Sequence, residues 1–320
     1  MAKETCLLIM SLRKQLLESF CEKSKKWDFW LNLVLFASLG FVFWPLTQWI
    51  ANSAQDQSRF FNALLVLVFA VFILAYFNRI SVTQTLALNS PARNSLLLAY
   101  LCILITFFLN RLTEPSFLRN ITLSSISVTA YCSALCAFVL FIFGVQLRRI
   151  AYTACASFGT FIILSTFMST LDWPLRSLAG EWSAKLLNLL GKSVELGISE
   201  SAEVAPQLIL SVNQIPFVVA SECNGFGVIL TSLLLALLLT LYQRLRPLSL
   251  LINLIAALFT GMAFNAVRIV AIVLLAPHTM TQYDLMHEIV GAASFWTCLC
   301  TVWILMGGPT RSALRSDAEA

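Results

Sequence analysis

The sequence predicts an all-α polytopic membrane protein with about eight transmembrane helices. Of its 320 residues, 59% are hydrophobic and only 12% are charged, whereas soluble domains carry about 25% charged residues. Apolar runs recur that approach or exceed the roughly 20 residues that a helical span needs. The net charge of +5 comes from basic residues in short segments between these runs. That pattern is typical of membrane topology and does not indicate nucleic-acid binding.

The apolar runs define the predicted organisation of the chain. Residues 1–28 and 307–320 are polar tails, residues 29–171 form a five-span region, and residues 172–306 combine one long loop with three spans. The first span is expected to be its own anchor, because the apolar stretch before it is too short for a signal peptide. The eight predicted spans are Phe29–Ile50, Phe60–Phe77, Ser95–Asn110, Ile121–Val145, Ile150–Leu171, Cys223–Tyr242, Ser249–Ala276 and His287–Met306.

The distribution of Lys and Arg predicts that both termini face the cytoplasm. With that orientation, fourteen of the 21 basic residues fall in inside segments, six fall in outside segments, and Arg268 alone lies within a span. This asymmetry follows the positive-inside rule. Cys223 and His287 then begin spans at the outer face. Arg268 lies about eight residues before an outer end, or roughly 12 Å below the surface at 1.5 Å per residue.

The long loop from Asp172 to Glu222 is predicted to lie outside. Its first part is expected to be an amphipathic helix on the outer membrane surface, ending at Gly191. The polar stretch Val194–Pro206 is expected to be a loop, and Leu208–Ala220 a short extended pair that leads into Cys223. The apolar stripe of the helix comprises Leu175, Leu178, Trp182, Leu186, Leu189 and Leu190.

Cys223 is the first candidate for chemistry. It is the only one of nine cysteines at the predicted outer boundary, so the chain offers it no disulfide partner there. Backbone N–H groups at a helix start stabilise a thiolate. Gly225 and Gly227 permit close approach of another backbone or a substrate. The alternative is a buried thiol that only packs, as expected for the mid-span cysteines.

Arg268 and His287 are the other two candidates. An ionisable side chain within a span is rare and usually functional, although Arg268 at this depth can also snorkel to the interface. Asn265 lies three residues earlier on the same helical face. His287 is alternatively an ordinary interfacial histidine, and Asp284 and Glu288 are candidates for orienting its ring.

Metal and cofactor sites are not expected. The two histidines are nine residues apart and flank a predicted turn, a spacing unlike that of zinc sites. The sequence also contains neither a phosphate-binding loop of the Walker type nor a dinucleotide fingerprint. The candidate chemistry is therefore that of side chains alone.

Three short motifs resemble the exosortase/archaeosortase family of multi-spanning cysteine transpeptidases. They are CNG at Cys223–Gly225, NAVR at Asn265–Arg268 and HEIVG from His287, within a resemblance that covers about Asp172 to Trp296. The resemblance implies that Cys223, Arg268 and His287 are catalytic. Supporting roles then fall to Glu222, Asn224, Gly225, Asn265 and Glu288. The family usually has Ser or Thr after the cysteine, where this chain has Asn224. The preceding Glu222 disfavours a thiolate unless Arg268 offsets its charge.

The resemblance also implies substrates and a location. The substrates would be secreted proteins with a C-terminal sorting signal of the PEP-CTERM kind, which combines a short motif, a transmembrane helix and a basic end. An envelope lipid or polysaccharide would be the acceptor, and the site would face the periplasm from a bacterial inner membrane. Two other classes remain open, an anion-binding transporter and a non-catalytic scaffold for exopolysaccharide assembly. The first five spans contain no charged residue that favours a transporter.

Overall fold

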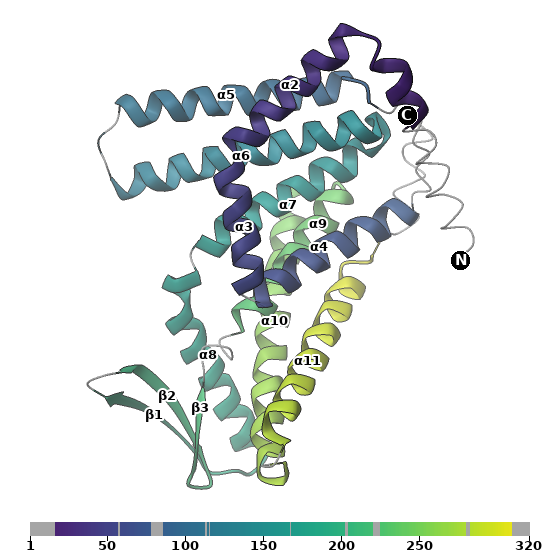
Figure 1. Ribbon diagram of the computed structural model, residues 1–320. Helices are drawn as coiled ribbons and strands as arrows, with labels where there is room; N and C mark the ends of the chain where they lie inside the picture. The colour runs from purple at the N-terminus through teal and green to yellow at the C-terminus, as the bar shows by residue number, and fades with distance from the viewer. Residues whose placement is uncertain are drawn as a thin grey trace. The chain divides into compact units, whose positions relative to one another are not determined.

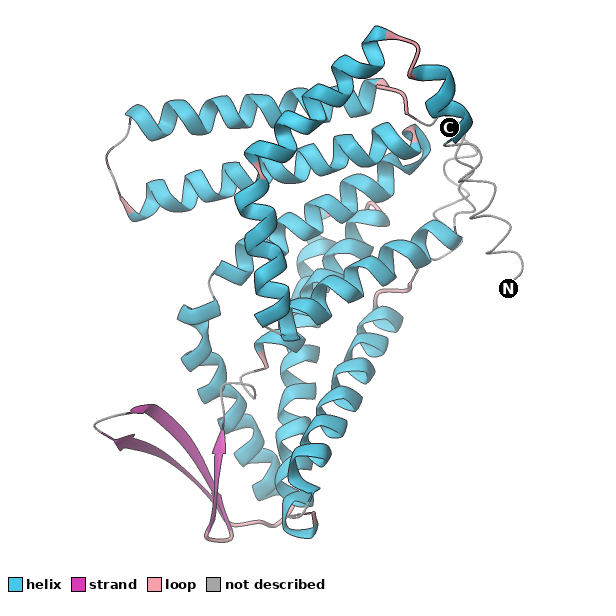
Figure 2. Cartoon of the chain, viewed as in Figure 1, coloured by secondary structure: helices cyan, strands magenta, loops and turns pink. Residues whose placement is uncertain are grey.

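The computed structural model describes residues 17–56, 58–77, 86–112, 114, 116–166, 168–201, 204–219, 225–279 and 282–308. The chain is mostly helical (Figure 1) and divides into two compact units, residues 1–163 and residues 164–320. The elements described in the first unit are all helices. The second combines helices with one small antiparallel sheet (Figure 2).

The first unit is built mainly from long apolar helices. Among them α5 and α6 share the most extensive contact and lie side by side (Figure 1). Aromatic rings join α2 to α6, for example Phe36 to Phe141 with ring centroids 5.1 Å apart. The helices are α2 (Trp27–Val42), α3 (Trp44–Asp56), α4 (Ser58–Phe77), α5 (Ser90–Leu112), α6 (Phe117–Phe143) and α7 (Arg148–Thr166), with the 3-10 turn η1 (Val145–Leu147) before α7.

The first predicted span is not one straight helix. The chain bends by 58° between α2 and α3, at Phe43. Pro45 explains the bend, because proline lacks an N–H and its ring clashes with the carbonyl four residues earlier. The predicted span Phe29–Ile50 therefore corresponds to two helices joined at a bend.

The described helices confirm a multi-pass membrane protein. Five helical segments are long and apolar enough to cross a membrane, and a sixth results if the bent α2–α3 pair counts as one span. Two shorter apolar segments, Phe60–Tyr76 and Phe226–Tyr242, coincide with the second and sixth predicted spans. The count of eight and the cytoplasmic position of both termini remain predictions.

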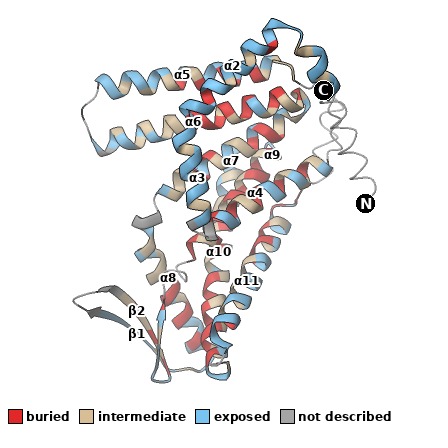
Figure 3. Cartoon of the chain, in the orientation of Figure 1, coloured by how far each residue is buried: buried red, intermediate tan, exposed pale blue. Residues whose placement is uncertain are grey.

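The second unit is arranged around one long helix. The helix α10 packs against α8, α9 and α11, and α8 also covers strands β1 and β2. Figure 3 shows buried residues along α9 and one side of α10. The elements are α8 (Met168–Leu189), β1 (Val194–Ser201), β2 (Val204–Val212), β3 (Ile215–Val219), α9 (Phe226–Tyr242), α10 (Pro247–Leu275), the 3-10 turn η3 (Ala276–His278) and α11 (Tyr283–Leu305).

The helix expected in the long loop corresponds to α8, but it buries a different face. Its buried side chains are small, such as Ala179, Ser183 and Ala184, together with Leu187. Close packing on the sheet explains this choice, since a Cβ added to Gly180 would lie 2.7 Å from the Leu208 side chain. Leu186, Leu189 and Leu190 of the predicted stripe are exposed on the protein, and their position on the membrane surface remains a prediction.

The stretch Val194–Pro206, expected to be a loop, supplies strand β1 and the start of β2 instead. The sheet order is β1-β2-β3, with both pairs antiparallel. The apolar side chains of β1 alternate with Glu195, Gly197 and Ser199, so one face of the strand is apolar. The extended pair expected over Leu208–Ala220 corresponds to β2 and β3. Positive φ angles at Asn213 and Gln214 close this pair in a two-residue turn.

Candidate active site

Asn265 lies on the buried face of α10. Ala257, Gly261, Asn265 and Ile269 recur at intervals of four and are all buried, which places them on one side of the helix. At Gly261 an added Cβ would lie 3.0 Å from the backbone of Ile229, so α9 and α10 cross in close contact. Asn265 follows Gly261 by one helical turn on α10 and is 2% exposed.

Gly225 brings the start of α9 onto Asn265. The glycine is the N-cap of α9 and has a φ of 74°, in the left-handed region where other residues are strained. A Cβ at this position would lie 2.5 Å from Cγ and 2.6 Å from Nδ2 of Asn265. The contact therefore needs a glycine for two separate reasons, its backbone conformation and the space it leaves.

Arg268 turns toward α11 and lies against Gly291. A Cβ built on Gly291 would be 3.2 Å from the guanidinium Nη2 and 3.3 Å from Cζ and Nε of Arg268. Gly291 follows His287 by four residues in α11, and residues four apart share one face of a helix. The guanidinium of Arg268 thus lies one helical turn from His287, on the same face of α11.

The surroundings of His287 separate it from the other histidine. His287 is partly buried in the first turns of α11, and its ring lies 6.1 Å from the ring of Tyr283. His278 is exposed in η3. Asp284 and Glu288 are exposed as well, and Glu288, as the next residue on the helix, points about 100° away from His287.

Glu222, Cys223 and Asn224 lie outside the described residues, so the structure does not test where the thiol lies. The described residues that flank this segment in the sequence both contact α10. Val219, at the end of β3, shares a buried cluster with Ile269 of α10. Gly225 contacts Asn265, as described above.

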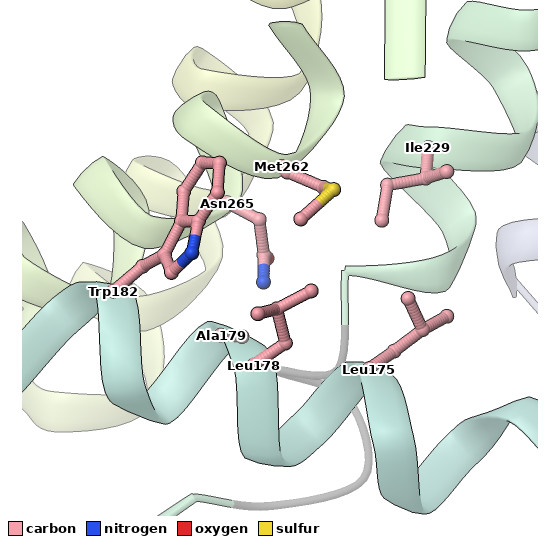
Figure 4. A pocket seen from close by; sticks show the side chains of 7 residues that line it. All are labelled: Leu175, Leu178, Ala179, Trp182, Ile229, Met262 and Asn265. Carbon is pink, nitrogen blue, oxygen red and sulfur yellow. The ribbon is translucent and has the colours of Figure 1, made fainter. Parts of the chain in front are cut away.

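A small pocket opens beside Asn265 (Figure 4). Its cavity volume is about 10 Å³. Helix α8 forms one wall, and the side chain of Asn265 supplies the polar group among apolar neighbours. The lining residues are Leu175, Leu178, Ala179, Trp182, Ile229, Met262 and Asn265. The pocket therefore has room for about one water molecule, with the amide of Asn265 as its polar partner beside the start of α9.

Two features of this region were not assigned from the sequence. Gly291 was visible within the HEIVG motif, but only the packing of Arg268 against it reveals its role. The wall of α8 was also missed, because Leu175, Leu178 and Trp182 were expected to face lipid, whereas they line the pocket. The spacing of four between His287 and Gly291 was the available signal for the first feature.

Replacing Gly225 with alanine is expected to lower both stability and any activity of this site. A non-glycine residue in the left-handed region costs about 1–2 kcal/mol, and the new Cβ would displace Asn265. The apparent melting temperature of the detergent-solubilised protein measures the first effect. The matched control is Gly197→Ala, since a Cβ on Gly197 meets nothing within 4 Å. Equal melting temperatures for the two variants would contradict the assigned contact.

Among the described residues, no three His, Cys, Asp or Glu side chains gather as a metal-binding group. A family model described as transmembrane exosortase matches residues 49–304. The match spans well over half of the chain and includes α8 to α11, with the motifs around residues 223, 268 and 287. No curated protein and no solved structure matches the chain.

Proposed function

Because the chain belongs to the transmembrane exosortase family, we propose that it is a membrane-embedded cysteine transpeptidase or protease. Its substrates are secreted proteins that end in a short recognition motif, a transmembrane helix and a basic segment, the PEP-CTERM-like signal. The enzyme cuts before the tail helix at the outer face of a bacterial inner membrane. The predicted topology supports this face, because it places Cys223, Arg268 and His287 toward the outside.

In the proposed reaction Cys223 is the nucleophile. Its thiolate attacks the carbonyl carbon of the scissile peptide bond, and a carbon–sulfur bond forms. The carbon–nitrogen bond then breaks, and the tail leaves with a new amino terminus. His287 donates the proton that this amine needs. The product on the enzyme is a thioester that joins Cys223 to the secreted protein.

Arg268 stabilises negative charge during this step. The guanidinium stays protonated and presents several N–H donors in a fixed plane. Such a group stabilises the thiolate before the attack and the oxyanion of the tetrahedral intermediate after it. Its support on Gly291 holds the charge beside the turn that carries His287. Preorganised donors act more strongly than mobile ones, because they need no rearrangement as the reaction proceeds.

The thioester is resolved by an acceptor. An amine on an envelope lipid or polysaccharide attacks the thioester carbonyl, and His287 accepts the proton of that amine. Transfer to such an anchor is the proposed outcome. Water in place of the amine gives simple proteolysis by the same steps.

The observation that carries this proposal is how α10 joins two motifs. Asn265 contacts Gly225, two residues after Cys223, while Arg268, three residues further, contacts Gly291 in the His287 segment. Cys223 comes two residues before Gly225 in the sequence, so the motif of the proposed nucleophile adjoins the contact with Asn265. An anion transporter or a passive scaffold would not require the cysteine motif to lie next to these contacts.

Trapping the thioester tests the proposal. Membranes that contain the enzyme and a secreted reporter with a sorting tail are quenched in acid and separated without reducing agent. We expect a covalent adduct of the enzyme with the tail-less reporter, which neutral hydroxylamine releases because it cleaves thioesters. Mass spectrometry should locate the adduct on Cys223. If the reporter loses its tail without any hydroxylamine-sensitive adduct, the proposed acyl-enzyme mechanism is wrong.

A further inference from the structure

The strand β3 leads toward the proposed nucleophile. It ends at Val219, and Cys223 follows four residues later. Val219 is buried in the same cluster as Ile269 and Val270, the two residues that follow Arg268 in α10. The end of β3 is thus anchored beside the turn of α10 that carries the candidate cation.

The middle of β3 lies near the start of α11. Phe217 packs against a buried cluster of Ile272, Ala276 and Met286. Met286 is the residue before His287 in α11. One face of β3 therefore runs along the same parts of α10 and α11 that hold Arg268 and His287.

The hydrogen-bond ladder determines which backbone groups of β3 face away from β2. The N–H of Asn213 donates to the carbonyl of Ser193 at 2.9 Å. By alternation, the backbone N–H and carbonyl groups of the odd-numbered residues of β2 form hydrogen bonds with β1. Even-numbered residues then bond toward β3, where they pair with Ile215, Phe217 and Val219. Since successive residues point their backbone groups to opposite sides, Pro216 and Val218 direct theirs to the outer edge.

Within the described part of the chain, β3 pairs with β2 alone (Figure 2). Pro216 has no N–H, and proline within a sheet is confined to such an outward position. The outer edge therefore offers the carbonyl of Pro216 and both the N–H and the carbonyl of Val218. Val218 is 54% exposed, so a second strand can reach these groups.

We infer that this edge of β3 binds the substrate polypeptide as an added strand, an inference that rests on the proposed function. The paired segment consists of the extended residues just before the scissile bond. Main-chain hydrogen bonds give such binding its affinity and do not depend on side-chain identity. Since β3 ends four residues before Cys223 in the sequence, a strand paired with it adjoins the segment of the proposed nucleophile.

The occupant is a substrate segment and not a second copy of the sheet. The edge strand has only five residues and contains a proline, so it matches a short peptide segment and not a long strand of another sheet. Its three free backbone groups suffice to align one extended peptide. The continuity of β3 with the Cys223 segment favours the polypeptide that is to be cut.

Proline at position 218 tests the edge. Val218→Pro removes the outward N–H and leaves the β2–β3 ladder, and it should slow release of the reporter tail about tenfold or more. The matched control is Ile198→Pro, which removes an outward N–H from the far edge of β1, since Ile198 pairs with Leu208 and is 59% exposed. That control should process at the wild-type rate. Equal rates for the two variants, whether high or low, would overturn the inference.

Disulfide trapping tests the edge without proline. The double variant Cys223→Ala/Val218→Cys is combined with reporters that carry single cysteines at successive positions before the tail helix. Cross-strand neighbours lie about 5 Å apart and alternate in facing, so crosslinks should form at every second position. Ile198→Cys in the same background should give none. Crosslinks at every third or fourth position, or none with Val218→Cys, would exclude a paired strand.

The two proposals fail in different ways. If Cys223→Ala alone still releases the tail, the proposed function is wrong, whatever the crosslinks show. If Cys223→Ala blocks release and the crosslinks lack the two-residue period, the function stands and the binding edge is wrong.

Discussion

Replacing Cys223 with alanine is expected to abolish release of the tail from a secreted reporter. The variant lacks the thiol that is proposed to form the thioester. Loss of a catalytic nucleophile typically lowers the rate by a factor of about 10³ or more. Immunoblotting of the tailed and cleaved reporter in cells measures the effect, normalised to the amount of enzyme in the membrane.

Cys300→Ala is the matched control for this experiment. Cys300 is an exposed free thiol in α11 and belongs to none of the three motifs. It should process the reporter at the wild-type rate. Normal processing by Cys223→Ala, or equal losses in the two variants, would refute the assignment of Cys223 as the nucleophile.

The helical membrane architecture was predictable because long apolar runs leave a chain few alternatives in a bilayer. Two local structures were predicted wrongly or not at all, because the residues there favour more than one structure. Strand β1 was expected to be a loop because of Glu195, Ser199 and Glu200, although Val194, Leu196 and Ile198 alternate with polar residues. The bend at Phe43 was not predicted, because the segment is apolar throughout and Pro45 is the one residue in it that breaks a helix.

The periodicity of the sequence could not predict which face of α8 is buried. Its leucines form a convincing stripe, but Gly180 and Ala184 permit closer packing, so the small-residue face is the one that meets the sheet and α10. Which of two faces is buried depends on the shape of the partner surface, and that shape is set by residues distant in the sequence.

In the candidate site, too, the residue types were predictable and their contacts were not. The residue types at positions 265, 268 and 287 pointed to one region, but which helix each side chain contacts was not deducible. Asn265 and Arg268 are three residues apart on α10, yet one contacts the start of α9 and the other contacts α11. These contacts depend on how the helices pack against one another. Gly225 and Gly291 determine how closely the side chains of Asn265 and Arg268 approach the neighbouring helices.

Replacing Arg268 with lysine should separate a catalytic role from simple anchoring at the membrane interface. A long cationic side chain that only snorkels can be replaced, because lysine snorkels as well as arginine. A guanidinium that lies flat on Gly291 and directs several donors at an oxyanion cannot, since an ammonium is a compact point charge. We expect Arg268→Lys to lower kcat for tail release by a factor of about 10²–10³, the cost of losing one preorganised donor group.

The kinetic pattern distinguishes this loss from a defect in substrate binding. If the donors of Arg268 act on charge that develops in the reaction, as proposed, kcat should fall while KM stays nearly constant. Loss of a binding contact on β3 would raise KM instead. Arg246→Lys is the matched control, since Arg246 is exposed at the start of the same helix, and it should leave both parameters unchanged. Wild-type kcat in Arg268→Lys would mean that Arg268 serves only to anchor α10, because only an anchoring role tolerates the change in donor geometry.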